Sequence, residues 1–138
     1  LNSDFSKKEN MADAQLNKMA VSGIDPQPMS KENPWYKYYS FLPKEESVDD
    51  GNMIQTDSKN YEANPFGLFS MHGNIAEWTR SSYVPYPYKD KSKVSSEYKV
   101  VRGGSYIDRP KFSTSYERKA YYPWQRVHNV GFRVIIED

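Results

Sequence analysis

Proline and glycine interrupt this sequence so often that a long helix fits into little of it. The 138 residues include nine prolines and seven glycines. Residues 22–34 alone hold three prolines and a glycine, and a proline inside a helix removes a hydrogen bond and clashes with the preceding turn. The apolar pieces between these breaks are short, and aromatic residues make up 15% of the chain. The pattern predicts one loop-rich domain with short strands and an aromatic core.

Charge and composition exclude several classes of function. The chain has 19 basic and 18 acidic side chains, so nothing in its charge predicts binding to nucleic acid or to an anionic membrane. No apolar run approaches 18 residues, which excludes a predicted membrane span. The absence of cysteine excludes disulfides, thiolate metal sites and a thiol nucleophile. The two histidines, His72 and His128, are too few for a histidine-rich metal centre.

Regular elements are expected only at a few places. Good helix formers with spaced apolar residues predict a short helix or helical turn over 9–21. Strands are predicted over 98–102 and, at the end of the chain, over 130–136. Residues 112–122 fit either a strand or a helix. Residues 81–97, rich in serine, proline and lysine, are predicted to form a loop within the domain.

Four motifs occur in an order that resembles one known family. They are ENMAD at 9–13, NPFGLFSMHGNIAEWT at 64–79, VVRGGSY at 100–106 and NVGFRVI at 129–135. Together they resemble the C-terminal half of the formylglycine-generating enzyme, or sulfatase-modifying factor, family. The stretch that begins DRPKFSTSYERKAYY is similar to a branch of this family common in bacteria that carry many sulfatases.

The resemblance implies a fold and a partner. The family fold is an irregular α+β arrangement related to C-type lectins, with residues 1–138 as the C-terminal part of a single domain roughly twice as long. The missing N-terminal half, or another protein chain, is the expected partner, and the isolated part is expected to expose a large apolar seam. The resemblance favours the cell envelope or secretion as the location, whereas the start of the chain indicates no compartment.

Glu77 stands in the stretch GNIAEWT, between Ala76 and Trp78, where a carboxylate is partly shielded from water and needs a partner. The residues alone allow backbone N–H groups or an arginine, such as Arg80 or Arg102, as that partner. The resemblance implies a calcium ion, because Ca²⁺ takes six to eight oxygen ligands and accepts backbone carbonyls. The implied ligands are the Ser70 side chain, the carbonyls of Gly73 and Ile75, and the Glu77 carboxylate.

A second calcium site is implied by the same resemblance. Its ligands would be the Asn10 side chain, the carbonyl of Met11, the Asp50 carboxylate and the carbonyl of Asn52. The alternative is that the acidic pair before Gly51 forms only a surface turn, which is what Asp-Gly pairs commonly do. Both calcium ions would fasten loops and neither would be catalytic.

The catalytic cysteines of the family have no counterpart here. In the family, two cysteines shortly after the RGGS motif bind copper and oxidise a substrate cysteine. Alignment on that motif places Asp108 and Ser113 at these positions, and oxygen ligands do not replace thiolates for copper(I). We therefore expect no copper and no formylglycine synthesis by that route. A non-catalytic domain for binding or scaffolding, a pseudoenzyme, is the first hypothesis.

Two alternatives remain open from the sequence. An enzyme with altered chemistry would use a pocket framed by Ser105, Asp108, Arg109 and Asn129, although Asp108 and Arg109 could equally pair with each other at the surface. A glycan-binding module, or a peptide-binding one, would use exposed aromatic side chains, since such surfaces are common at recognition sites. Its best candidates are Tyr86 and Tyr88, against the alternative that most aromatics form the core.

Overall fold

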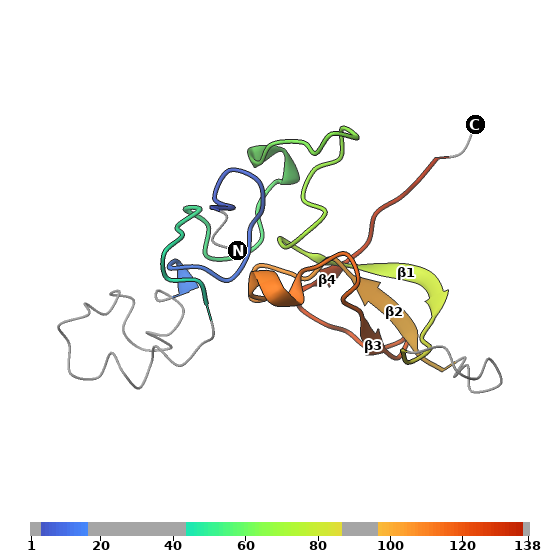
Figure 1. Ribbon diagram of the computed structural model, residues 1–138. Coiled ribbons are helices and arrows are strands. Elements are labelled where there is room, and N and C mark those ends of the chain that lie inside the picture. Colours follow the sequence, from blue (N-terminus) through green and yellow to red (C-terminus); the bar gives the residue numbers. More distant parts are fainter. Residues whose placement is uncertain (1–3, 17–43, 87–96, 137–138) are drawn as a thin grey trace, which may run out of the picture.

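The computed structural model describes residues 4–16, 44–86 and 97–136 (Figure 1). This part consists of one small sheet on one side and long irregular loops on the other. None of its helices is long and apolar enough to cross a membrane. The regular elements are the 3₁₀ turns η1 (Ser58–Asn60) and η3 (Pro110–Phe112) and the strands β1 (Ala76–Ser82), β2 (Lys99–Arg102), β3 (Lys119–Tyr121) and β4 (Val130–Gly131).

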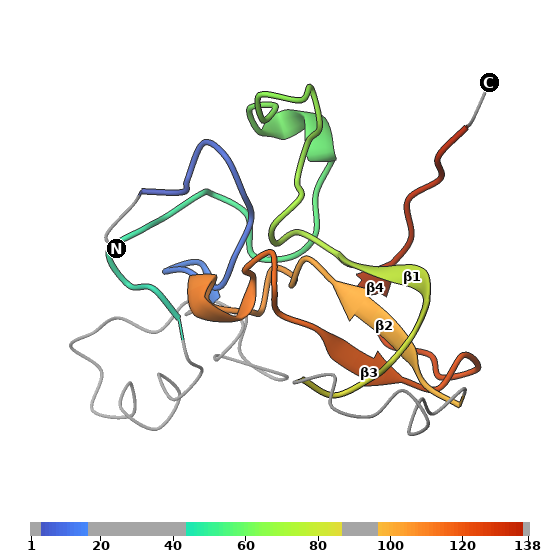
Figure 2. The same cartoon turned by 45° about the vertical axis from the view of Figure 1, so that its right-hand side comes forward.

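The sheet is mixed, with the strand order β3-β2-β1-β4. β1 pairs antiparallel with β2, so that Glu77 lies opposite Arg102, and pairs parallel with β4, so that Glu77 also lies opposite Gly131. β2 pairs antiparallel with β3 through Val101 and Lys119 among others. Figure 2 shows β1 and β2 at the centre of the sheet. Glu77 therefore has a neighbouring strand on each side.

The centre of the sheet is built from β-branched residues. Val100 and Val101 of β2 are 2% and 1% exposed, and Ala76 at the start of β1 is 1% exposed. Branched side chains pack well on a pleated surface, which explains why this short run forms a strand. A second apolar cluster lies under the loops and joins Phe5, Met11 and Val48.

The irregular loops of residues 4–16 and 44–75, here called the loop layer, approach the start of β1 closely through the backbone of Asn10. The amide of Asn74 donates to the carbonyl of Asn10 at 2.6 Å. Gly73 has φ 88°, and a Cβ at this position would lie 2.1 Å from the same carbonyl oxygen. Only glycine meets both demands, because it tolerates positive φ and leaves room for the neighbouring chain.

The structure confirms some expected elements and corrects others. The strand over 98–102 is confirmed as β2, and the ambiguous segment 112–122 ends in strand β3. The short helix or helical turn expected over 9–21 is absent from residues 9–13, which hold only a bend and a bridge; residues 14–15 form a turn, Leu16 is helical, and 17–21 lie outside the described residues. The predicted loop over 81–97 gives its first two residues to β1, and 87–96 also lie outside the described part.

The last strand is much shorter than expected. Only Val130 and Gly131 pair with a neighbour, and residues 132–136 have no ladder partner among the described residues. The apolar side chains of this segment are 72–86% exposed. Figures 1 and 2 both show the segment leaving the sheet toward the C-terminus. The strand-forming composition is present, but no strand within 4–16, 44–86 or 97–136 pairs with residues 132–136. The irregular mixture of strand and loop agrees with the expected α+β class, and the relation to C-type lectins stays a prediction.

Candidate functional site

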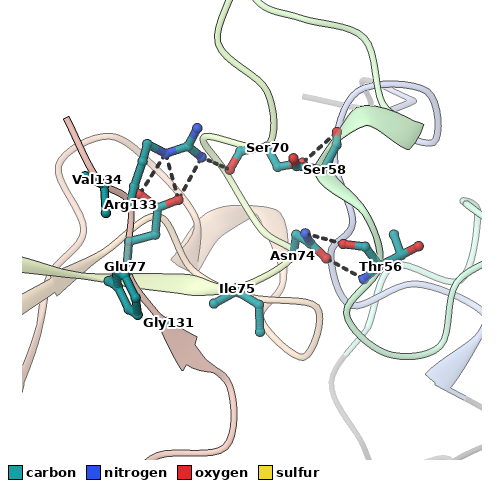
Figure 3. A pocket seen from close by; sticks show the side chains of 10 residues that line it. Thr56, Ser58, Ser70, Asn74, Ile75, Glu77, Gly131, Arg133 and Val134 are labelled. Carbon is teal, nitrogen blue, oxygen red and sulfur yellow. Dashed lines mark hydrogen bonds and ion pairs between the residues drawn. The ribbon is translucent and has the colours of Figure 1, made fainter. Parts of the chain in front are cut away.

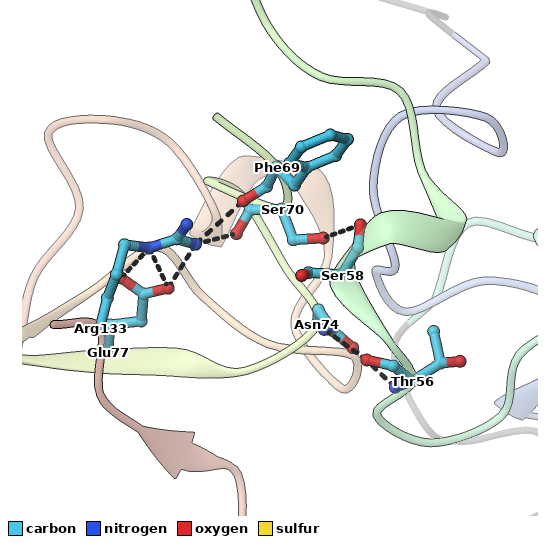
Figure 4. A network of polar contacts seen from close by, with 7 residues as sticks. All are labelled: Thr56, Ser58, Phe69, Ser70, Asn74, Glu77 and Arg133. Carbon is cyan, nitrogen blue, oxygen red and sulfur yellow. Dashed lines mark hydrogen bonds and ion pairs between the residues drawn. The ribbon is translucent and has the colours of Figure 1, made fainter. Parts of the chain in front are cut away.

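Glu77 pairs with Arg133, as Figure 4 shows. Arg133 Nη2 donates to Glu77 Oε1 at 2.7 Å, and Arg133 Nε donates to both carboxylate oxygens at 3.0 and 3.2 Å. Nη2 also donates to the carbonyl of Phe69 at 2.9 Å. The hydrogen bonds to Glu77 raise the pKa of Arg133 further above its ordinary value. A carboxylate and a guanidinium in this fork geometry satisfy each other well.

The partner of Glu77 is thus an arginine, but neither of the two named as examples from the sequence. Arg102 lies opposite Glu77 in β2, yet its Nη1 donates to the carbonyl of Ser115 at 2.8 Å. Arg133 follows β4, which is the parallel neighbour of β1. Two residues beyond Gly131, it lies on the same face as Glu77 because side chains alternate along an extended chain. The contact between Glu77 and Arg133 depends on the pairing of β1 with β4, which the sequence alone does not predict.

Three of the four residues of the first implied calcium site line one cavity (Figure 3). Ser70, Ile75 and Glu77 border it, and its volume is about 470 Å³. Gly73 lies in the same turn but is absent from the lining. Ser70 and Asn74 adopt φ values of 47° and 58°, which non-glycine residues rarely do and which concentrate at functional sites.

The donor set of this first site suits a hard cation. Among the described residues, no hydrogen bond is accepted by the carbonyl oxygen of Gly73 or Ile75. The Ser70 hydroxyl makes one long hydrogen bond, of 3.4 Å, to the carbonyl of Ser58. These oxygens fit the ligand preference of Ca²⁺. A cation here would share the Glu77 carboxylate with Arg133, so its affinity would depend on that pair.

The second implied site contains an orphaned acceptor. Asn10 is fully buried, its Nδ2 donates to the carbonyl of Ile54 at 2.8 Å, and its Oδ1 has no partner among the described residues. Buried unsatisfied oxygens are uncommon in native proteins, and an ordered water or a bound cation is the usual partner of such an atom. Asp50 accepts from the amide of Asn52 at 2.7 Å and from the Tyr61 hydroxyl at 3.1 Å, and burial raises its pKa. The Asn10 oxygen is therefore available to a ligand on this side of the fold.

Two further acids, missed in the sequence, lie in the same loop layer. Asp13 is 1% exposed and accepts from the amides of Gln15 and Asp50, while burial raises its pKa to about 6. Burial also raises the pKa of Glu9 to about 7 and outweighs the opposing backbone hydrogen bonds. Within the described part, no three His, Asp or Glu side chains form a metal-binding group. A calcium ion in this part of the structure would rely on carbonyl oxygens as well as carboxylates.

The sequence-predicted pocket is a buried polar network. Asp108 Oδ2 accepts from the amide and from the hydroxyl of Ser105 at 2.9 and 2.7 Å. Asn129 Nδ2 donates to Ser105 Oγ at 2.8 Å, which brings three of the four predicted residues together. Lys119 Nζ donates to both oxygens of Asp108 at 2.7 and 2.8 Å. Sequence reasoning missed Lys119, because its place depends on the pairing of β3 with β2.

Arg109 and Ser113 lie outside this network. Arg109 Nε is buried without a partner among the described residues, and its guanidinium lies 5.7 Å from the ring centre of Phe112. It does not pair with Asp108, whose carboxylate faces Lys119. Ser113 is 3% exposed, and its Oγ lies 2.2 Å from the position that a Cβ on Gly104 would take. Ser113 therefore packs against a glycine and presents no chemistry to solvent.

The aromatic candidates are arranged differently from the prediction. Tyr86 is 53% exposed but lies under the guanidinium of Arg118 at 3.5 Å, and Tyr88 lies outside the described residues. Trp124 is 76% exposed and stacks on Tyr122 with ring centres 5.1 Å apart. This stack lies in the stretch AYYPW, and its Trp124 ring is more exposed than the ring of Tyr86.

Comparison with known proteins bears on residues 10–138. The sequence profile described as "Sulfatase-modifying factor enzyme 1-like domain" matches residues 10–138. The chain is 28% identical over 101 residues to a formylglycine-generating enzyme of Streptomyces coelicolor, an alignment that covers 67% of this chain and 32% of that protein. It is 32% identical over 75 residues to a Mus musculus protein named inactive C-alpha-formylglycine-generating enzyme 2, covering 51% of this chain and 22% of that protein. The matched part thus spans a third or less of each relative.

Proposed function

The chain belongs to the sulfatase-modifying factor enzyme 1-like family, and we propose that it is the C-terminal part of a non-catalytic member that serves binding or scaffolding. Calcium is proposed to fasten its loops. The observation that carries the non-catalytic proposal is the state of Asp108, which stands where the resemblance expects the first cysteine. Its two oxygens accept four hydrogen bonds, two from Ser105 and two from Lys119.

This network leaves Asp108 poorly suited to other chemistry. A general base needs a lone pair directed at a substrate proton, and here the lone pairs face an ammonium and a serine. Ser105 is 0% exposed and its hydroxyl proton is donated to Asp108, so the serine is not presented as a nucleophile. The polar groups are paired with one another and fix the segment after the RGGS motif. They support a structural role over an altered active site.

The test of this proposal is an oxidation assay. The purified chain, and a longer version that includes whatever residues precede it in the natural protein, are supplied with copper and a cysteine-containing peptide. We expect no aldehyde by mass spectrometry in either case, because Asp108 and Ser113 stand where the resemblance expects the cysteine pair, and their oxygens do not replace thiolates for copper(I). Aldehyde formation that survives chelation and repurification would reject the proposal. The Streptomyces relative is the positive control for the assay.

The proposed calcium ions would be held by oxygen atoms of the two sites described above. For the first, these are Ser70, Gly73, Ile75 and Glu77; for the second, Asn10, Met11, Asp50 and Asn52. When bound, Ca²⁺ supplies electrostatic cross-linking of loops and no redox chemistry. The buried unpartnered oxygen of Asn10 and the unused carbonyls of Gly73 and Ile75 support this proposal.

A glycan-binding role is a second candidate, supported by one observation. Trp124 presents an exposed indole that is braced by Tyr122, which in turn hydrogen-bonds through its hydroxyl to Tyr98 at 2.7 Å. A rigid aromatic face costs little conformational entropy when a ligand stacks on it. Glycan-array binding that is lost in Trp124→Ala but kept in Tyr86→Ala would support this role. Equal glycan binding by the unaltered chain and both variants, or no binding by any of them, would reject the glycan-binding role.

A further inference from the structure

The segment after β4 lines two cavities. Phe132 and Val134 line the cavity of about 470 Å³ beside Ser70 and Ile75. Ile135 lines another, of about 620 Å³, on the side of Met71 and Trp78. Arg133 borders both and anchors the segment through Glu77. Phe132 and Val134 therefore line one cavity and Ile135 the other, as expected where side chains alternate along an extended chain.

The segment has the chemistry of a buried central strand. Phe132, Val134, Ile135 and Ile136 are 72–86% exposed, although apolar runs of this kind occur in strands that are covered on both faces. Such contiguous exposed apolar surface is rare on monomeric proteins and marks an interaction site. Residues 132–136 also have backbone groups without a ladder partner among the described residues. The complementary element must supply both backbone pairing and apolar cover.

The larger cavity adds a charge requirement. Its lining carries three guanidinium groups, from Arg80, Arg102 and Arg133, against a single carboxylate, Glu77, which leaves two positive charges. Both oxygens of Glu77 already accept from Arg133. Covering Arg102 with apolar chain alone would bury an arginine without a carboxylate, which is costly. The element that covers this cavity is therefore expected to carry an acidic side chain.

We propose that residues 132–136 and the cavity beside Arg102 form a docking surface for an extended apolar strand that bears a carboxylate. The source of that strand is the rest of the same family domain, which lies outside this chain. The alignment covers only 32% of the Streptomyces relative, so most of that relative's length lies outside the matched part and is available to provide such a strand. Pairing of this kind adds a strand to an unfinished sheet edge, with main-chain hydrogen bonds giving affinity and side-chain pockets giving specificity.

The proposal rests on the part of the proposed function that makes this chain one portion of a larger domain. The two can fail separately. Aldehyde formation would reject the non-catalytic role and leave the docking surface intact, whereas failure to bind a strand would reject the surface and leave the non-catalytic role intact.

The experiment uses the 138-residue chain and two labelled peptides that differ in one side chain. The probes are acetyl-TVEVTV-amide and acetyl-TVKVTV-amide, followed by fluorescence anisotropy, with hydrogen exchange monitoring the amides of residues 132–136. We expect the acidic peptide to bind at least about tenfold more tightly than the basic one and to protect those amides. Arg102→Gln should remove about tenfold of that preference, while Arg126→Gln, at an exposed site outside both cavities, should not change it.

Val134→Ser provides a second variant that leaves the arginines untouched. The substitution should weaken the binding of both peptides without altering the preference for the acidic one, because it removes an apolar side chain and no charge. Equal binding of the two peptides, or no binding, would overturn the proposal. Strong protection of 132–136 in the chain alone would also overturn it, whether gel filtration showed a dimer or a monomer, because the surface would then already be covered by a second copy or by another part of this chain.

Discussion

Arg133 fastens the end of the chain to β1 by holding Glu77, 56 positions earlier, with three hydrogen bonds of 2.7–3.2 Å. The side chains are one-quarter to one-third exposed, so the pair is neither fully solvated nor fully buried. The Arg133 guanidinium also reaches the carbonyl of Phe69, which ties the turn before β1 to the same anchor. The pair therefore joins three segments: the Phe69 turn, β1 and the C-terminal segment.

The first prediction is that this pair is energetically coupled. Glu77→Gln and Arg133→Met are each expected to lower the free energy of unfolding by about 1–3 kcal/mol, since each leaves the other charge without its partner. A double-mutant cycle by urea denaturation should give a coupling energy of about 1 kcal/mol or more. The comparison is the ion pair of Lys44 and Glu46, where a longer contact of 3.6 Å joins a lysine side chain that is 3% exposed to a glutamate side chain that is 51% exposed. Its coupling should stay below about 0.5 kcal/mol, and equal coupling in both cycles would contradict the prediction.

The second prediction concerns Asp108. Asp108→Ala leaves Lys119 without a carboxylate and Ser105 without its acceptor, so we expect a loss of about 2–4 kcal/mol in the free energy of unfolding. Asp57→Ala is the control, because Asp57 caps η1 through one exposed hydrogen bond to the amide of Lys59. The loss there should be about 1 kcal/mol or less. If the two substitutions cost the same, the network does not hold the segment after the RGGS motif.

Local signals in the sequence predicted those parts of the fold that depend on interactions between residues close together in the sequence. The valine pair before Gly103 predicted β2, and its residues are now buried at the centre of the sheet. The strand predicted over 130–136 is confirmed only for Val130 and Gly131, because residues 132–136 have the composition of a strand but no ladder partner among the described residues. A strand needs an edge, and the sequence of the strand alone does not show whether one is present.

The candidate site divides in the same way. The RGGS motif predicted Ser105 and Asp108 as pocket residues, the motif NVGFRVI predicted Asn129, and the structure joins the three by hydrogen bonds. The cationic partners of the two carboxylates are Lys119 for Asp108 and Arg133 for Glu77. Their positions depend on strand pairing, of β3 with β2 and of β4 with β1. An ion pair between residues distant in sequence is specified by register, so it becomes readable only once the sheet order β3-β2-β1-β4 is known.

The third prediction is that calcium stabilises the chain. Removal of bound ions with a chelator should lower the melting temperature, and added Ca²⁺ should restore it more than Mg²⁺ does, because carbonyl-rich sites suit the larger and more flexible ion. At a free concentration of 100 times the dissociation constant, binding would add about 2.7 kcal/mol. The measurement is calorimetry in chelator, in calcium and in magnesium. A melting temperature that is the same in all three buffers would contradict the calcium proposal.

Two substitutions assign the calcium effect to a site. Asn10→Ala removes the buried oxygen of the second site and should abolish that part of the calcium-dependent stabilisation. Ser70→Ala removes one ligand of the first site, whose carboxylate is shared with Arg133, and should weaken calcium binding there without affecting the second site. Isothermal titration of the two variants separates the contributions. If both variants bind calcium as the unaltered chain does, the ligand sets are wrong.

The last prediction compares two glycines with almost the same backbone angle. Gly73 and Gly51 have φ values of 88° and 83°, so alanine is strained at both by about 1 kcal/mol. A Cβ at Gly51 meets nothing within 4 Å, whereas at Gly73 it would lie 2.1 Å from the carbonyl oxygen of Asn10. Gly73→Ala must push the loop layer away from β1 and should cost about 3 kcal/mol or more, against about 1 kcal/mol for Gly51→Ala. Chemical denaturation of the two variants measures the difference, and a similar loss in both would show that the approach of Asn10 to β1 is not tight.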